Sequence, residues 1–124
     1  MAAKVVDASA LAALLFGEPA AEAVAHRLQH AEMVAPALLP FELTNVCWKK
    51  RRLHPEQAEA LMQGLRRFSR LRTRLVEVDH EEVLILAEAS GLTAYDASYL
   101  WLARRLGVEL VTLDGRLEAA DPGA

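Results

Sequence analysis

The chain alternates between short apolar runs and longer segments in which apolar residues recur every three or four positions. Short β-branched and apolar runs indicate buried strands, whereas the longer period indicates amphipathic helices. The strands predicted in this way cover residues 4–6, 32–35, 74–79 and 108–114. The predicted helices cover residues 8–18, 20–30, 37–52, 54–71, 80–91, 93–107 and 115–120.

Prolines, glycines and aspartates mark the ends of several predicted helices. Pro40 fits a first helical turn, so the regular helix around it is expected to begin near residues 39–41. Asp79 is expected to cap the helix that follows it, and Gly91 and Gly107 are expected to end two helices. The tail, residues 121–124, is expected to fray.

This order of elements predicts an α/β fold with a mostly parallel sheet. The sequence has no internal repeat, low-complexity linker or second-domain boundary, so a single domain is expected over residues 1–124. In open parallel sheets, ligands bind at the carboxyl ends of the strands. The first and last predicted strands end at Asp7 and Asp114, so these carboxylates emerge side by side if the two strands are neighbours.

Composition narrows the class of protein. The hydrophobic share of 53% suffices for a core, and no apolar run approaches the roughly 20 residues that span a bilayer. The amino-terminal segment contains one Lys and an interrupting Asp, so it is not expected to be a secretory signal, and a cytoplasmic protein is expected. The single cysteine, Cys47, excludes an internal disulfide and a multi-cysteine metal site, and we expect a buried structural thiol.

The net charge of −3 hides a basic segment. Residues 49–74 contain nine Lys or Arg against two Glu, which leaves the rest of the chain strongly acidic. A basic segment in an acidic protein is compatible with a polyanionic partner. The alternative is a solvated helix face without a partner.

Glu42 stands among apolar residues in the stretch "LLPFELTNVCW". A helix this apolar is expected to be largely buried, and a buried carboxylate without a partner is expensive. Asn45 lies three residues further along the same helical face and is expected to hydrogen-bond it. The alternative places Glu42 on an exposed face of the helix.

Three aspartates, Asp7, Asp96 and Asp114, stand at the starts of predicted helices, where each could serve as an N-cap. If they converge with Glu42, the carboxylates raise one another's pKa values, and a divalent cation relieves that repulsion. A site of carboxylates without cysteine selects Mg²⁺ or Mn²⁺ rather than zinc. Such ions activate water for attack on phosphate esters.

Four motifs carry a resemblance to a known family. They are "VVDASA", "PFELTNV", "LTAYDASYLWLA" and "LVTLD", in this order over nearly the whole chain. Together they resemble the PIN-domain ribonucleases. In length and in "YDASYLWLA", the chain is most similar to the VapC toxins of bacterial type II toxin–antitoxin pairs. The resemblance implies a PIN-like α/β fold, with a central, mostly parallel sheet flanked by helices on both faces.

The resemblance also implies roles for individual residues. It implies that the metal is held by Asp7, Glu42, Asp96 and Asp114. It implies positions beside the acids, or positions that orient the substrate, for Ser9, Asn45 and Thr112. Many relatives have a further acid soon after the last Asp; here Gly115 and Arg116 follow, and the next acid is Glu118, so the number of metal ions stays open.

The implied activity is that of a metal-dependent endoribonuclease toxin, which hydrolyses RNA with a metal-activated water. The implied partners are an RNA substrate, a second copy in a homodimer, and an antitoxin whose helical tail covers the acidic cleft. Candidates for binding the RNA backbone are Lys49, Lys50, Arg51 and Arg52. Unpaired bases could stack on Tyr95, Tyr99 or Trp101, although we expect Trp101 and Leu100 to pack in the core.

Other functions remain as alternatives. His26 and His30 have a spacing that can hold zinc on a helix, but no third ligand is nearby and we expect a surface pair. A phosphatase of the haloacid dehalogenase type normally has a second Asp two positions after the first, where this chain has Ser9. In a non-catalytic binding module, the acids would only cap helices.

Overall fold

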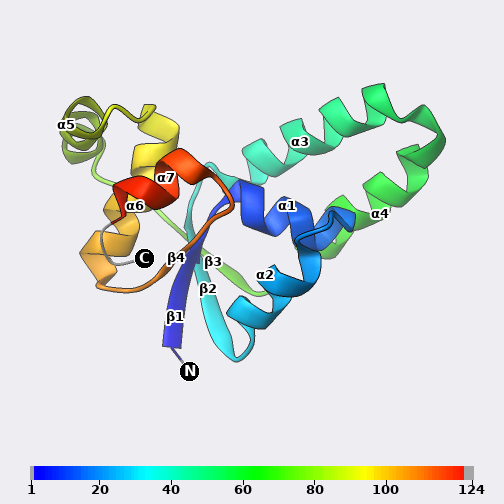
Figure 1. Cartoon of the computed structure of the whole chain (residues 1–124), viewed down its shortest axis with the longest axis horizontal. Helices are drawn as coiled ribbons and strands as arrows, with labels where there is room; N and C mark the ends of the chain where they lie inside the picture. The colour runs from blue at the N-terminus through cyan, green and yellow to red at the C-terminus, as the bar shows by residue number, and fades with distance from the viewer. Residues whose placement is uncertain (1, 122–124) are drawn as a thin grey trace.

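Four parallel strands form the centre of the structure, in the order β3-β2-β1-β4 (Figure 1). The computed structural model describes residues 2–121. The strands are β1 (Ala2–Val6), β2 (Ala31–Pro36), β3 (Thr73–Val76) and β4 (Leu110–Val111). Val5 pairs with Val34 on one side and with Leu110 on the other. The neighbouring, parallel arrangement expected for the first and last strands is therefore confirmed.

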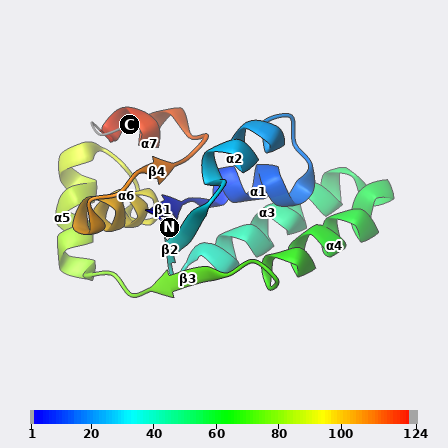
Figure 2. The same cartoon turned by 90° about the horizontal axis from the view of Figure 1, so that it is seen from below.

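Helices cover both faces of this sheet. They are α1 (Ala8–Phe16), α2 (Ala21–Leu28), α3 (Leu39–Leu53), α4 (Ala58–Phe68), α5 (His80–Ser90), α6 (Ala94–Leu106) and α7 (Gly115–Ala120), with a 3₁₀ turn η1 (Pro55–Gln57) before α4. The chain moves from β1 to β2 to β3 in one direction and returns to β4 in the other. Because parallel crossovers are right-handed, α1–α4 lie on one face and α5 and α6 on the opposite face (Figure 2). The predicted fold class is confirmed.

The neighbouring strands β1 and β4 contribute deeply buried residues to the core. Val5, Val6 and Val111 are fully buried and Leu110 is 1% exposed. Strands covered on both faces read as continuous apolar runs, which is why these segments lack the alternation of a half-exposed strand. The core therefore fixes the carboxyl ends of β1 and β4 firmly against each other.

The predicted elements all occur, but two strands are shorter than predicted. The strand predicted at 74–79 ends at Val76, and the one predicted at 108–114 keeps only Leu110–Val111. After Val111, side chains replace the ladder: the Leu113 N–H donates to Ser9 Oγ (2.9 Å) and the Asp114 N–H donates to Thr112 Oγ1 (3.0 Å). The helix predicted at 54–71 opens with the 3₁₀ turn and ends at Phe68.

Most of the predicted helix ends are confirmed. Pro40 lies in the first turn of α3, which begins at Leu39. Asp79 caps α5 through a hydrogen bond from the Glu82 N–H (3.1 Å). Gly91 and Gly107 end α5 and α6 in left-handed conformations, with φ of 73° and 66°. The tail that was expected to fray covers residues 121–124, and residues 122–124 lie outside the described residues.

A close contact fixes the α3–α4 hairpin against α1. At Gly64 in α4, a Cβ atom would lie 2.6 Å from the Leu15 carbonyl oxygen and 2.8 Å from Cδ1 of Phe16. Only glycine allows this approach without displacement. The Arg67 guanidinium also donates to the Leu15 carbonyl. Because α4 is held in this way, α3 has a defined position beside the carboxyl ends of the strands (Figure 1).

Within residues 2–121, no single helix is long and apolar enough to span a membrane; only α1 and α2 together, bent by 115°, reach the required length and composition.

Candidate functional site

Asp7 and Asp114 follow the neighbouring strands β1 and β4 and are joined through one threonine. Thr112 Oγ1 donates to Asp7 Oδ2 at 2.5 Å, and the same oxygen accepts the Asp114 N–H at 3.0 Å. The two strand ends are therefore linked by side chains at the place where the sheet ladder stops. This is the side-by-side arrangement that the strand positions predicted.

Asp7 serves both as a helix cap and as the centre of a hydrogen-bond network. Its Oδ1 accepts from the Ala10 N–H (3.0 Å) and from Ser9 Oγ (2.7 Å), and the residue is 4% exposed. The capping interpretation is thus correct for Asp7. It does not compete with a functional role, because the same bonds hold the carboxylate at the end of β1.

The capping interpretation also holds for Asp114 but is wrong for Asp96. Asp114 Oδ1 accepts from the N–H groups of Arg116 (2.9 Å) and Leu117 (3.0 Å) and caps α7. The cap of α6 is Thr93, whose Oγ1 accepts the Asp96 N–H at 3.1 Å. Asp96 lies inside the first turn of α6, so its carboxylate is not used as the cap.

The partner of Glu42 is Tyr99 rather than the predicted Asn45. The Tyr99 hydroxyl donates to Glu42 Oε1 at 2.5 Å, and Tyr99 is 1% exposed. A tyrosine buried this deeply does not stack on a base, so that prediction for Tyr99 is wrong. The spacing in the sequence could have indicated this role, because Tyr99 follows Asp96 by three residues and lies on the same face of α6.

Helix α3 is less buried than its apolar sequence predicted. Phe41 is 80% exposed and Trp48 is 52% exposed, whereas Leu39 and Leu43 are fully buried. The helix covers the core with one stripe only, because the α3–α4 hairpin extends beyond the sheet (Figure 1). Glu42 lies half-buried at the edge of that stripe.

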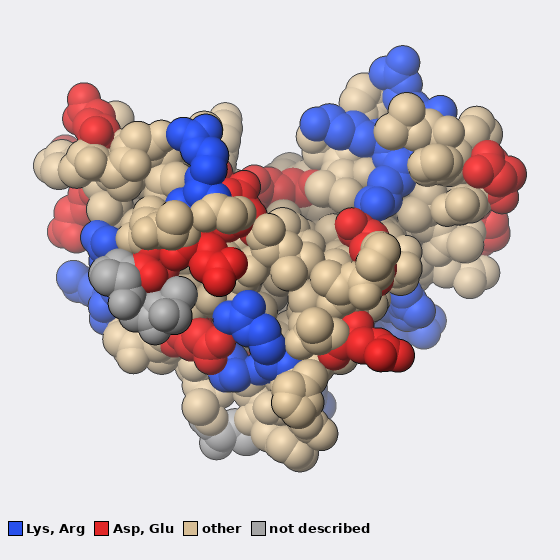
Figure 3. Space-filling model, viewed as in Figure 1, with Lys and Arg blue, Asp and Glu red and all other residues tan. Residues whose placement is uncertain are grey.

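The pKa values of Asp7, Glu42 and Asp96 are raised by burial and by the charges of neighbouring carboxylates. Burial raises the pKa of Asp7, and the charge of Asp114 raises it further. The pKa of Glu42 is raised by burial and then by Asp96 and Asp7. Burial likewise raises the pKa of Asp96, followed by the charges of Asp114 and Asp7. The expected convergence is therefore present in electrostatic terms, and Figure 3 shows acidic side chains in the hollow between α6 and α7 on one side and the α3–α4 hairpin on the other.

All four carboxylates lie at helix amino termini. Asp7 and Asp114 are the caps of α1 and α7, and Glu42 and Asp96 lie in the first turns of α3 and α6. The positive end of a helix dipole stabilises a nearby carboxylate. The fold thus offsets part of the repulsion with four helix termini that meet at one edge of the sheet.

The chemistry of these donors fits a hard divalent cation, because every one is a carboxylate oxygen. Among residues 2–121, no group of three or more Asp, Glu, His or Cys side chains is placed so that it could hold a metal ion directly. Protein donors occupy both oxygens of Asp7 and one oxygen each of Glu42 and Asp114. A cation would therefore draw on Asp96, on the second oxygens of Glu42 and Asp114, and on Asp7 Oδ2, which has a single protein donor and keeps a lone pair.

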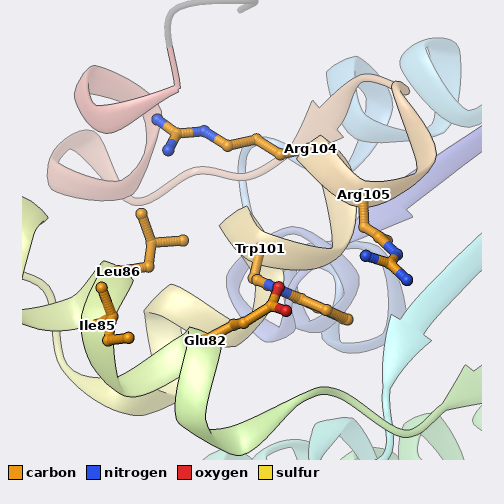
Figure 4. A pocket seen from close by; sticks show the side chains of 6 residues that line it. All are labelled: Glu82, Ile85, Leu86, Trp101, Arg104 and Arg105. Atoms are coloured by element: carbon orange, nitrogen blue, oxygen red, sulfur yellow. The ribbon is translucent and has the colours of Figure 1, made fainter.

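A separate pocket of about 380 Å³ between α5 and α6 contains none of the predicted carboxylates (Figure 4). Trp101 forms part of its wall and donates from Nε1 to Glu82 Oε1 at 2.9 Å. The Arg105 guanidinium lies 5.8 Å from the centre of the Trp101 ring. Trp101 packs against the core from a partly buried position, so the expectation of a packing role is largely confirmed.

Two further sequence predictions concern residues outside the acidic cluster. His26 and His30 are both exposed, as expected for a surface pair. Cys47 is 2% exposed, its Sγ donates to the Leu61 carbonyl at 3.5 Å, and burial raises its pKa. The expected buried structural thiol is confirmed.

Comparison with known proteins identifies the family. The sequence matches the PIN domain over residues 4–122. The chain belongs to the PIN-domain family. The resemblance inferred from the four motifs is therefore confirmed, and the haloacid dehalogenase alternative is excluded.

Several relatives of this PIN domain come from Pyrobaculum aerophilum. Ribonuclease VapC3 is 33% identical over 123 residues, covering 95% of this chain and 94% of the relative. Exonuclease VapC9 is 37% identical over 123 residues, covering 96% and 86%. The crystal structure of PAE2754 superposes with a TM-score of 0.81 at 32% identity and covers 99% of this chain and 87% of that one. The protein is a PIN domain of the VapC type.

Neutralising one carboxylate of this PIN-domain cluster should stabilise the metal-free fold at neutral pH. A raised pKa means that the folded state holds its proton to a higher pH than the unfolded chain does, so stability falls as pH rises through that window. We expect Asp96→Asn to raise the free energy of unfolding in EDTA at pH 7, by up to about 1 kcal/mol. The gain should shrink as pH falls toward the ordinary range of Asp, as measured by urea denaturation.

Asp79→Asn is the matched control, because Asn caps helices as well as Asp does and Asp79 is an exposed cap at the start of α5. It should change stability little at either pH. A loss of stability in Asp96→Asn at pH 7 would contradict the repulsion inferred for the cluster.

Proposed function

We propose that this VapC-type PIN domain is a metal-dependent endoribonuclease and the toxin of a toxin–antitoxin pair, acting in the cytoplasm. The observation that carries the proposal is the set of four charge-coupled carboxylates at the carboxyl edge of a PIN-domain sheet. Helix capping in a non-catalytic module would explain only Asp7 and Asp114. It would not explain why Glu42 and Asp96 are placed where they repel these two carboxylates. The names of the VapC relatives support the nuclease class.

The metal would be held by Asp7, Glu42, Asp96 and Asp114. When bound, Mg²⁺ or Mn²⁺ supplies a Lewis acid and lowers the pKa of water for attack on the phosphodiester. The protein's own part is orientation. Ser9 and Thr112 hold Asp7, and Tyr99 holds Glu42, so that the carboxylates face the same hollow before the substrate arrives.

The basic end of α3 supports the proposed contact with RNA. Figure 3 shows Lys and Arg side chains gathered at the projecting end of the α3–α4 hairpin. Lys49 and Arg52 are exposed, and the Arg52 guanidinium lies 4.9 Å from the centre of the Trp48 ring. Lys50 is paired with Glu18 at 3.6 Å, and Arg51 is half-buried. We therefore assign the backbone phosphates chiefly to Lys49 and Arg52.

The acidic hollow also supports the proposed antitoxin. Its carboxylates lack enough positive neighbours: Arg116 is the cation whose charge lowers the pKa of Asp96. A tail that carries Arg or Lys over this hollow would neutralise the cluster and occupy the place of the metal. Homodimer formation is proposed from the resemblance to VapC toxins.

Replacing a metal-binding carboxylate should abolish RNA cleavage without unfolding the chain. We expect Asp96→Asn and Asp7→Asn each to reduce cleavage of single-stranded RNA in Mn²⁺ more than about 100-fold, because even outer partners of metal ligands contribute 10–100-fold. Circular dichroism reports folding, and a circular RNA substrate distinguishes internal cleavage from removal of end nucleotides. Asp79→Asn should cleave normally. Undiminished cleavage in both site variants would refute the assignment.

Removing the two exposed cations of α3 should weaken the salt dependence of RNA binding. Each phosphate contact with a single strand contributes about 0.7 to the slope of log K against log salt. We expect Lys49→Gln with Arg52→Gln to reduce the magnitude of that slope by about 1.4 in fluorescence-anisotropy titrations. The pair Arg104→Gln and Arg105→Gln removes equal charge from α6 and should leave the slope unchanged. Equal effects of the two pairs would argue against a specific site on α3.

A further inference from the structure

A second cavity opens directly beside Glu42. It has a volume of about 300 Å³ and is lined by Leu38, Phe41, Glu42, Asn45 and Tyr95. Phe41, Glu42 and Asn45 share one face of α3, Leu38 immediately precedes that helix, and Tyr95 comes from the first turn of α6. Because Glu42 belongs to both, this cavity and the acidic cluster form one continuous surface.

Two exposed aromatic rings belong to this cavity. Phe41 is 80% exposed and Tyr95 is 67% exposed, and neither side chain belongs to the core or packs against it. Tyr99, one turn along α6, is 1% exposed by contrast. Large exposed apolar groups beside a polar site mark a binding surface, because folding alone gives no reason to leave them in water.

The polar group of the cavity is an unengaged amide. Asn45 is exposed, and within residues 2–121 its side-chain amide makes no hydrogen bond. It follows Phe41 by four residues on α3, so the amide and the ring lie on the same helical face. An amide presents both a donor and an acceptor, which suits the edge of a nucleobase.

We propose that this cavity holds one unpaired nucleobase of the RNA, next to the phosphate that is cleaved. The inference rests on the proposed ribonuclease function and extends it to the choice of nucleotide. The charged group in the lining is Glu42, whose carboxylate repels a phosphate but does not repel a neutral base. Phe41 and Tyr95 supply faces for stacking, and Asn45 supplies the edge contact.

The position of Tyr95 connects base binding to cleavage. Tyr95 immediately precedes Asp96, and both lie in the first turn of α6. A base stacked on Tyr95 therefore brings its own backbone close to Asp96. A base must be unstacked from its neighbours to enter, which favours single strands and loops over duplexes.

The test removes the base from the substrate and the ring from the protein. Single-stranded RNA oligonucleotides, each with one abasic position, are titrated by fluorescence anisotropy in EDTA against the wild type, Tyr95→Ala and Tyr95→Phe. We expect one abasic position to weaken binding to the wild type about tenfold, on the scale of one lost base stack. That penalty should vanish in Tyr95→Ala and persist in Tyr95→Phe, which keeps the ring.

Phe41→Ala and Phe41→Tyr repeat the comparison for the second ring, and Ile85→Ala is a control that removes an exposed apolar side chain from α5. Only Phe41→Ala of these should reduce the abasic penalty.

Three results would overturn the inference. The first is an abasic penalty that is equal in the wild type and in Tyr95→Ala. The second is RNA binding that no abasic position weakens. The third is a Tyr95→Ala variant that no longer binds a basic peptide but binds RNA as the wild type does. The last result would assign the cavity to a protein tail. Failure of the wild type to cleave RNA in Mn²⁺, with the abasic penalty present, would refute the ribonuclease proposal and leave the base site standing.

Discussion

Repulsion among four carboxylates is the constraint around which this fold is arranged. Asp7, Glu42, Asp96 and Asp114 come from different parts of the chain, yet each is placed at the amino terminus of a helix. Helix dipoles and hydroxyl donors stabilise the ionised groups, while burial and mutual charge oppose ionisation. The balance favours a proton or a bound cation in the hollow.

The parallel sheet makes this arrangement possible. Because β1 lies between β2 and β4, segments that begin and end the chain meet at one edge of the sheet. The crossover helices then bring α3 to one side and α6 to the other, and the hydrogen bond from Tyr99 to Glu42 ties those two helices together. The α3–α4 hairpin, held by the close contact at Gly64, carries Glu42 at the start of α3 and basic residues at its projecting end. A polyanion could thus be attracted by the basic end of the hairpin and bound through a cation in the acidic hollow.

Much of this was predictable from the sequence, because strand ends and helix starts follow local rules. Asp7 and Asp114 were placed together from two apolar runs, and the four motifs led to the family. The partner of Glu42 was missed because Tyr99 lies 57 residues away along the chain, beyond any helical spacing. The cap of α6 was assignable, since Thr93 stands three residues before Asp96 in the pattern of a capping box. The early end of the last strand could not be predicted. There the backbone hydrogen bonds of the sheet are replaced by bonds to the side chains of Ser9 and Thr112, which only the fold brings into place.

The central claim is that the four carboxylates form one cation site, and a crystal grown with Mn²⁺ tests it most directly. Anomalous diffraction locates manganese without reference to activity or sequence. The account predicts an anomalous peak in the hollow bounded by Asp7, Glu42, Asp96 and Asp114, with side-chain oxygens as its protein ligands. A peak elsewhere on the chain, or no peak at a manganese concentration that supports RNA cleavage, would contradict it.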